Sequence, residues 1–230
     1  MLPWDGYDAY LFDIDGTLLH CTDATHYFAF CDTLTHLAGR SLNLDGVVAH
    51  GNTDVGILRD ALIRNGVEDP SWRPQIAEAR ERMCRFVAER EKSLCAEVLP
   101  GVRKVLAHLS SLGSVLGVAS GNLREIGWMK LKCCGLDEHF SFGGFSDAYE
   151  YRRDIFRAAL EEARRRTRPD ASICVFGDTP ADVYAAHENR MDSIAVATGI
   201  YSWEELTLAS PRLCLHSLTE LFADEAAPAA

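Results

Sequence analysis

Short apolar runs, each ended by turn-forming residues, recur along the chain and are typical of buried parallel strands. They lie at residues 9–14, 115–119, 173–176 and 194–197. Helical patterns separate them; in residues 102–112 and 155–163, for example, apolar residues recur every three or four positions. Strands that alternate with helices predict an α/β fold with a doubly wound, Rossmann-like parallel sheet.

This alternation is interrupted once. Residues 15–114 separate the first predicted strand from the second, far more chain than one crossover helix requires. Helical patterns fill much of the interval, at residues 25–38, 54–65 and 74–93. We therefore predict a helical cap domain, residues 19–96, inserted over the strand ends of a core made of residues 1–18 and 97–230. The last residues, 223–230, are predicted to be a frayed tail.

Composition narrows the range of partners. A net charge of −11 over 230 residues argues against a nucleic-acid partner, which would need clustered Lys and Arg. No apolar run approaches the roughly 18 residues of a membrane span, and the N-terminus carries no apolar signal segment.

The eight cysteines form no CxxC pair and several lie in apolar runs, so we expect reduced thiols and a cytoplasmic location. A monomer and a homodimer both remain open.

Two carboxylates, Asp13 and Asp15, lie two residues apart where the first predicted strand gives way to a Gly16-Thr17 turn. Asp is unfavourable in a central strand, and an unpaired buried charge is costly. The pair therefore calls for a compensating cation. Mg²⁺, which prefers oxygen ligands, is the simplest candidate.

Polar residues also follow two later strands. The second strand leads into Ser120-Gly121-Asn122, and the third leads into a Gly-Asp-Thr-Pro-Ala-Asp run that contains Asp178 and Asp182. The first run could bind an anion at a helix N-terminus or be an ordinary turn with a helix cap. The second could cap a helix through Asp178 or Thr179. Because ligands of doubly wound sheets bind beyond the carboxyl ends of the strands, these runs are expected to meet the Asp13 region.

The combination and order of these motifs resemble the haloacid dehalogenase-like hydrolase superfamily, over residues 9–200. The resemblance implies that Asp13 is the nucleophile, which forms an aspartyl-phosphate, and that Asp15 is the general acid and base. Ser120 would bind the transferred phosphoryl group. Further residues are assigned to substrate or phosphate binding: Gly16, Thr17, Gly121, Asn122 and Thr53.

The same resemblance implies a Mg²⁺ site. The ion would be held by the carboxylates of Asp13 and Asp178, by the backbone carbonyl of Asp15, and by Asp182 directly or through water. Phosphoryl transfer depends mainly on positioning and charge neutralisation, which suits such a site.

One motif departs from the family pattern. The superfamily uses a basic residue, usually Lys, to offset the charge of the nucleophile and phosphate, but residues 146–156 contain no Lys. In relatives that use Arg, it lies three residues before the first apolar position of the following helix, so the resemblance selects Arg152 here, with Arg153 as the alternative. Arg can supply the same positive charge, through a wider guanidinium group that forms two parallel hydrogen bonds.

The predicted cap contains Gly51-Asn52-Thr53-Asp54, which looks like a cap loop of the phosphoglycolate phosphatase-like branch. An ordinary helix start capped by Thr53 or Asp54 explains the run equally well. His20 and His50 could face the cleft, but neither is assigned a role.

Together these features predict a Mg²⁺-dependent phosphatase that acts on a small phosphorylated metabolite. A phosphomutase similar to β-phosphoglucomutase is the enzymatic alternative, because it would use Asp13 and Asp15 in the same way. A non-catalytic binding module of the same fold is the other alternative. A dehalogenase is disfavoured because carbon–halogen displacement does not require Asp15.

Overall fold

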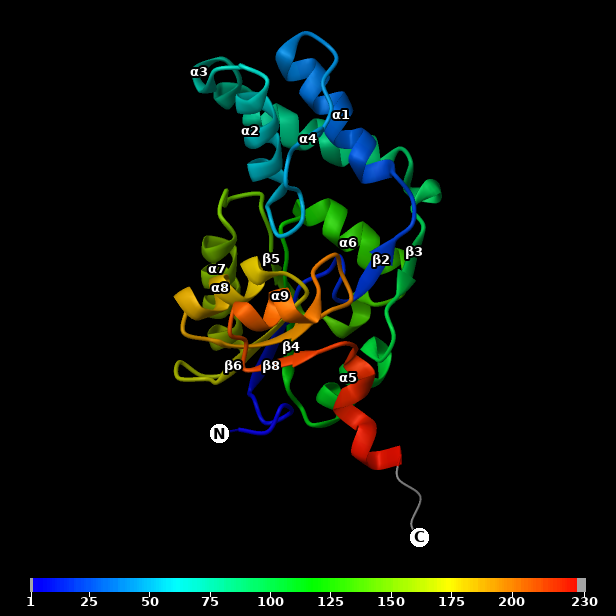
Figure 1. The fold of residues 1–230 in the computed structure, drawn as a ribbon, viewed down its shortest axis with the longest axis vertical. Coiled ribbons are helices and arrows are strands. Elements are labelled where there is room, and N and C mark those ends of the chain that lie inside the picture. The colour runs from blue at the N-terminus through cyan, green and yellow to red at the C-terminus, as the bar shows by residue number, and fades with distance from the viewer. Residues whose placement is uncertain (1, 227–230) are drawn as a thin grey trace.

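A six-stranded parallel sheet forms the centre of the computed structural model, which describes residues 2–226 (Figure 1). Its strands, in spatial order, are β5 (Phe142–Gly144), β4 (Val115–Ala119), β1 (Ala9–Phe12), β6 (Ile173–Gly177), β7 (Asp192–Val196) and β8 (Leu213–Leu215). Phe12 pairs with Val118 on one side and with Phe176 on the other. The carboxyl ends of β1, β4 and β6 are therefore level with one another.

Helices cover both faces of this sheet. They are α5 (Val102–Ser111), α6 (Arg124–Cys133), α7 (Arg152–Arg166), α8 (Pro180–Glu188) and α9 (Trp203–Leu208). Along β1 the side chains alternate: Tyr10 and Phe12 pack in the cluster that contains α5, whereas Leu11 packs in the cluster that contains α7 and α8. The predicted doubly wound α/β fold is confirmed.

The four strands expected from the sequence correspond to β1, β4, β6 and β7. The edge strands β5 and β8 were not predicted. Each contains three residues, and β5 reads Phe-Gly-Gly, so neither has the apolar run that marks a central strand.

Between β1 and β4 the chain forms the insertion, a name we keep for residues 19–96. A short antiparallel ribbon of β2 (Leu19–Cys21) and β3 (Ala96–Val98) lies at its base. Beyond the ribbon lie its helices, at the top of Figure 1: α1 (Thr25–Ala38), α2 (Asp54–Arg64), α3 (Asp69–Trp72) and α4 (Ile76–Ala88). Short 3-10 turns, Arg73–Gln75 (η1) and Glu91–Ser93 (η2), flank α4, so the predicted helix 74–93 is shorter than expected.

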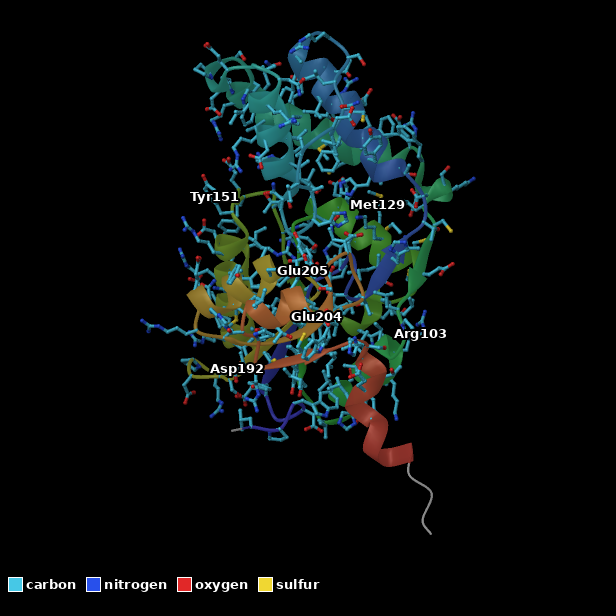
Figure 2. All side chains as sticks on the ribbon, viewed as in Figure 1. Arg103, Met129, Tyr151, Asp192, Glu204 and Glu205 are labelled. Atoms are coloured by element: carbon cyan, nitrogen blue, oxygen red, sulfur yellow. The ribbon has the colours of Figure 1, made fainter. Side chains whose placement is uncertain are left out.

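The insertion has its own apolar cluster, built from residues such as Leu34, Leu58 and Met83. The same cluster includes Leu123 and Ile126 of the core, and Met129 of α6 packs against it (Figure 2). Tyr151, just before α7, lies under the guanidinium group of Arg59 from α2. These contacts seat the insertion on α6 and on the start of α7.

Two smaller 3-10 segments complete the described chain, Asp137–His139 (η3) and Leu218–Ala226 (η4). Residues 223–226 of the predicted frayed tail are thus helical, and residues 227–230 lie outside the described residues. None of the helices between residues 2 and 226 combines the length and apolar character that crossing a bilayer requires.

Candidate active site

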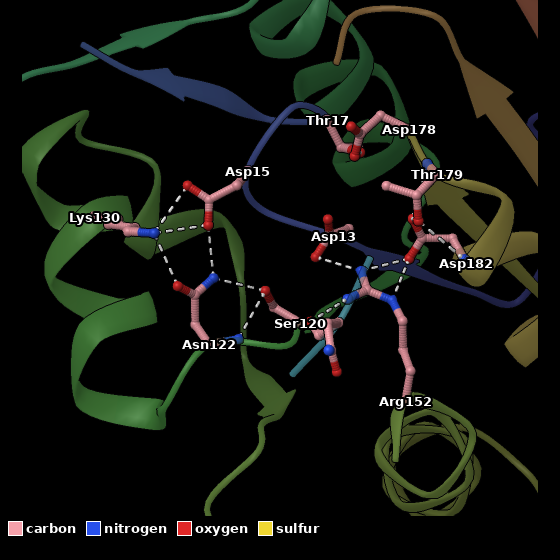
Figure 3. A network of polar contacts seen from close by, with 11 residues as sticks. Asp13, Asp15, Thr17, Ser120, Asn122, Lys130, Arg152, Asp178, Thr179 and Asp182 are labelled. Atoms are coloured by element: carbon pink, nitrogen blue, oxygen red, sulfur yellow. Dashed lines mark hydrogen bonds and ion pairs between the residues drawn. The ribbon is translucent and has the colours of Figure 1, made fainter. Parts of the chain in front are cut away.

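The predicted site residues meet at the carboxyl ends of three central strands. Asp13 follows β1, Ser120 follows β4 and Asp178 follows β6 (Figure 3). A cavity of about 370 Å³ opens above them and is lined by core residues and by residues of the insertion. The site therefore lies between the sheet and the insertion, where doubly wound sheets bind ligands.

Arg152, the first residue of α7, points into the carboxylate cluster. Its Nη2 atom lies 2.9 Å from Asp13 Oδ1, and its Nε donates to Asp182 Oδ1 at 2.7 Å. The Arg153 side chain is 54% exposed and lies over the ring of Tyr151. Of the two candidate arginines, Arg152 is the one in contact with the nucleophile proposed from the sequence.

Negative charge exceeds positive charge around Asp13. Oxygen atoms of the buried residues Asp13, Asp178 and Asp182 lie within 4.8 Å of one another, and Arg152 is the cation in direct contact with this cluster. Burial, followed by repulsion from neighbouring carboxylates, raises the pKa of Asp13 and of Asp178, although Arg152 opposes the shift. A buried set of carboxylate oxygens with surplus negative charge fits a hard divalent cation such as Mg²⁺.

Asp182 differs from the other two carboxylates because both of its oxygens already have partners. Oδ1 accepts from Arg152, and Oδ2 accepts from the backbone N–H and the hydroxyl of Thr179, at 3.1 and 2.7 Å. Asp182 and Thr179 form a capping box at the start of α8. Direct coordination of a metal by Asp182 would have to compete with these bonds.

Gly16 and Thr17 both lie against Asp178. Gly16 has a φ of +83°, and a Cβ atom there would lie 2.3 Å from Asp178 Oδ2, so the turn requires glycine. The Thr17 hydroxyl donates to Asp178 Oδ1 at 3.2 Å. Thr17, predicted to bind phosphate, is instead directed at the carboxylate that the sequence assigns to the metal.

A second carboxylate group lies on the other side of Ser120. Both oxygens of Asp15 accept from Lys130 Nζ of α6, at 2.9 and 2.8 Å, and Oδ2 also accepts from Asn122 Nδ2 at 2.8 Å (Figure 3). Burial alone would raise the pKa of Asp15, but the charge and hydrogen bonds of Lys130 outweigh it and lower the pKa to about 2. The carboxylate that the family resemblance makes the acid and base is therefore ionised here.

Sequence reasoning missed Lys130. It stands within the apolar helix segment Trp128-Met129-Lys130-Leu131, and a lysine there signals a buried partner. Burial by itself would lower the pKa of Lys130, yet the nearby Asp15 carboxylate outweighs that effect and raises it.

The turn after β4 contacts both Asp15 and the insertion. Asn122 Nδ2 donates to Ser120 Oγ at 2.8 Å as well as to Asp15. A Cβ atom at Gly121 would lie 2.1 Å from the backbone oxygen of Asn52, and the backbone N–H of Asp54 donates to the Gly121 carbonyl at 2.7 Å. Gly121 thus allows the loop before α2 to approach the core closely.

Thr53 was predicted to bind substrate, but its hydroxyl has structural partners. It accepts from the Gly56 N–H to cap α2 and donates to the carbonyl of Glu150 at 2.7 Å. The capping alternative therefore accounts for this residue. His20 and His50 both line the cavity, as does His26, which the sequence did not indicate.

Thr198 and Gly199 follow β7 and also line the cavity. The Thr198 hydroxyl donates to the Gly16 carbonyl at 2.6 Å, and a Cβ at Gly199 would overlap the carboxylate of Asp178. Both could have been found by applying the strand-end rule to the fourth predicted strand.

Residues 10–196 match the family described as haloacid dehalogenase-like hydrolase. This chain belongs to that family. Among curated relatives, "Probable phosphatase IndB" of Dickeya dadantii is 27% identical over 124 residues, which are 54% of this chain and 54% of that protein. The chain thus spans about half the length of that relative. "Putative pyrophosphatase PpaX" of Caldanaerobacter subterraneus subsp. tengcongensis is 23% identical over 216 residues, 93% of this chain and 92% of that one.

Solved structures share the fold. CbbY from Rhodobacter sphaeroides in complex with phosphate superimposes with a TM-score of 0.70 at 21% identity, covering 94% of this chain and 96% of that one. A predicted phosphatase from Clostridium acetobutylicum gives a TM-score of 0.68 at 20% identity and covers 95% and 98%. The family membership makes this protein a hydrolase.

Proposed function

We propose that this hydrolase is a Mg²⁺-dependent phosphatase that removes the phosphoryl group of a small metabolite through an aspartyl-phosphate on Asp13. The observation that carries the proposal is the buried cluster at the end of β1: Asp13 lies 2.9 Å from Arg152, beside Asp178, and two residues from a second carboxylate that faces the same cavity. The phosphatase and pyrophosphatase names of the relatives agree with it.

In the first step an Asp13 oxygen forms a bond to phosphorus while the bond from phosphorus to the leaving oxygen breaks. Asp15 gives its proton to that oxygen. Arg152 offsets the charge of Asp13 and the phosphoryl group, and Ser120 donates to a phosphoryl oxygen. Asp15 is ionised in the ligand-free protein; the negative charge of an incoming phosphate raises the pKa of a neighbouring carboxyl and so favours the protonated form.

In the second step water attacks the phosphorus of the aspartyl-phosphate. Asp15, now without its proton, accepts one from the water, and the bond between phosphorus and the Asp13 oxygen breaks. Free phosphate leaves and Asp13 is regenerated. A phosphomutase would differ here, because a sugar hydroxyl would take the place of the water.

Mg²⁺ would be held by the carboxylates of Asp13 and Asp178 and by the backbone carbonyl of Asp15. When bound, the ion supplies positive charge next to the transferring phosphoryl group. We assign Thr17 to orienting Asp178, and Asp182 to orienting Arg152, because those are the contacts that their oxygens make.

The insertion covers the cavity, so we propose that it acts as the cap domain and limits substrates to small phosphorylated metabolites. We also propose a cytoplasmic location, a monomer or homodimer, and no nucleic-acid or membrane partner. All eight cysteine thiols are unpaired, which agrees with a reducing compartment.

The test is hydrolysis of p-nitrophenyl phosphate and of a panel of phosphorylated metabolites. EDTA should abolish activity and Mg²⁺ should restore it, whereas Ca²⁺ should bind without supporting turnover because its coordination is larger and looser. Full activity after EDTA treatment and dialysis would exclude the metal. Conversion of glucose 1-phosphate to glucose 6-phosphate without phosphate release would favour the phosphomutase, and no turnover of any substrate would favour the binding module.

A further inference from the structure

Lys130 has a complete set of hydrogen bonds inside the protein. The residue is 3% exposed, and its ammonium group lies 2.8 and 2.9 Å from the two oxygens of Asp15, 2.9 Å from Asn122 Oδ1 and 3.1 Å from His26 Nδ1. An ammonium group has three donors and no acceptor, so these partners occupy all of them. Lys130 therefore has no free donor for a substrate, and its bonds serve the residues around it.

Those bonds fix the direction of the Asp15 carboxylate. Lys130 spans both carboxylate oxygens, and Asn122, held in turn by its own bond to Lys130, donates to one of them. Both partners come from α6 and the turn before it, not from the loop after β1 that carries Asp15. Figure 3 shows Lys130 on the side of Asp15 that faces away from Arg152, with Asn122 joined to both Asp15 and Ser120.

We propose that Lys130 is a positioning residue that holds the Asp15 carboxylate in place for proton transfer. The inference rests on the proposed function, since it assumes that Asp15 acts as acid and then as base. A carboxylate in the loop after β1 can rotate about two side-chain bonds, and proton transfer needs it within hydrogen-bond reach of the reacting oxygen. The fixed ammonium group removes that freedom.

A residue of the insertion completes the arrangement. Lys130 only donates, so its 3.1 Å contact with His26 Nδ1 is a hydrogen bond when that nitrogen accepts; the other ring nitrogen, Nε2, lies 3.2 Å from Asp54 Oδ2. Asp54 in turn accepts from the backbone N–H of Leu123 at 2.7 Å. These contacts connect the insertion, through His26, to Lys130 and Asp15. The packing of the insertion on the core therefore also helps to hold the Asp15 carboxylate in place.

The two chemical steps should depend on Lys130 to different degrees. With p-nitrophenyl phosphate the leaving group departs as a stable phenolate, so formation of the aspartyl-phosphate needs little help from Asp15. Attack of water on that intermediate still needs Asp15 as the base. With an alkyl phosphate, both steps need it.

The experiment is rapid-quench kinetics on Lys130→Met, with Lys132→Met, an exposed lysine of the same helix, as the matched control. With p-nitrophenyl phosphate and Mg²⁺, we expect the rate of p-nitrophenolate release in the first turnover to stay within about threefold of the unmodified protein. Decay of the aspartyl-phosphate should slow about 100-fold, within the range of general-base effects. A burst of one p-nitrophenolate per site should then appear. Lys132→Met should change neither rate.

Two further variants distinguish a loss of positioning from a folding defect. Lys130→Gln keeps a donor in the site and should recover part of the lost rate, and His26→Phe should give a smaller loss in the same step. Equal slowing of both steps with p-nitrophenyl phosphate, or no slowing of decay, would overturn the role of Lys130. Turnover without any phosphorylated Asp13 in the unmodified protein would instead overturn the proposed function, and the inference with it.

Discussion

The candidate active site contains two cation–carboxylate groups whose electrostatics differ. On one side Arg152 contacts Asp13 and Asp182, with Asp178 close by, and the pKa of Asp13 is raised. On the other side Lys130 is paired with Asp15, whose pKa falls to about 2. Both groups lie at the same end of the sheet.

The difference comes from the ratio of charges. Three carboxylates share Arg152, so the Arg152 group keeps surplus negative charge, whereas Lys130 balances Asp15. A divalent cation would relieve the first group and has nothing to offset in the second. The comparison thus favours the proposed metal site beside Asp13 and Asp178, and it separates that site from the Asp15 carboxylate, which Lys130 and Asn122 hold.

Replacing Asp13 with Asn should have the largest effect, because an amide cannot attack phosphorus. We expect turnover to fall roughly 10⁴-fold or more, as is typical when a nucleophile is removed. The fold should persist, since the change removes one charge from a repulsive cluster. Phosphate release by the purified variant measures the loss, and substantial residual turnover would show that Asp13 is not the nucleophile.

Arg152→Ala should cost about 3 kcal/mol of transition-state stabilisation, as loss of one charge-stabilising donor does, which is on the order of 100-fold in rate. Arg153→Ala is the matched control and should change rate and stability little, because its side chain is 54% exposed. Arg152→Lys should recover part of the loss. If Arg153→Ala were the impaired variant, the assignment of the cation to Arg152 would be wrong.

Stability of the metal-free protein should respond oppositely to changes in the two groups. The pKa of Asp178 is raised above 3.8, so the native state binds more protons and loses stability as pH rises. Asp178→Asn should therefore stabilise the metal-free protein by about 1 kcal/mol at pH 8 and by less at pH 4.

Asp15→Asn should instead destabilise the protein, because it leaves Lys130 buried without a counter-ion. A fully buried pair would cost about 3–5 kcal/mol, but the Asp15 side chain is 40% exposed, so we expect about 2 kcal/mol. Its pKa is lowered from 3.8 to about 2, so this cost should hold above pH 4 and shrink as pH falls below it. Urea unfolding at several pH values measures the free energy of unfolding of both variants. If Asp178→Asn and Asp15→Asn both stabilised the metal-free protein, or both destabilised it, the difference between the two groups would be contradicted.

Metal binding should add a modest stabilisation that depends on one of the two groups only. Mg²⁺ at ten times its dissociation constant should stabilise the native protein by about 1.4 kcal/mol, which thermal unfolding detects as a shift of a few degrees. Asp178→Asn should lose that shift, whereas Lys130→Met should keep it. If the shift depended on Lys130 and not on Asp178, the metal would bind beside Asp15, and the proposed metal site would be wrong.

Strand-end residues were predictable because a parallel sheet brings the carboxyl ends of its strands together. Asp13, Ser120 and Asp178 lie where the pattern and the family resemblance place them. The directions of two hydroxyls were not predictable: Thr17 is turned to Asp178, and Thr53 to Glu150. Sequence spacing fixes which strand end a residue occupies, but packing of the turn decides where its side chain points.

The sequence by itself determined the doubly wound sheet, the insertion between its first two predicted strands, the acidic cluster and the family, because these follow from local periodicity and contiguous motifs. Only the tertiary structure decided which arginine enters the cluster and that Lys130 balances Asp15. Those pairings join residues far apart in the chain, through helices whose rotation about their axes depends on the packing of the whole core. The buried ammonium group of Lys130 required a counter-ion, but only the fold could bring Asp15 to it.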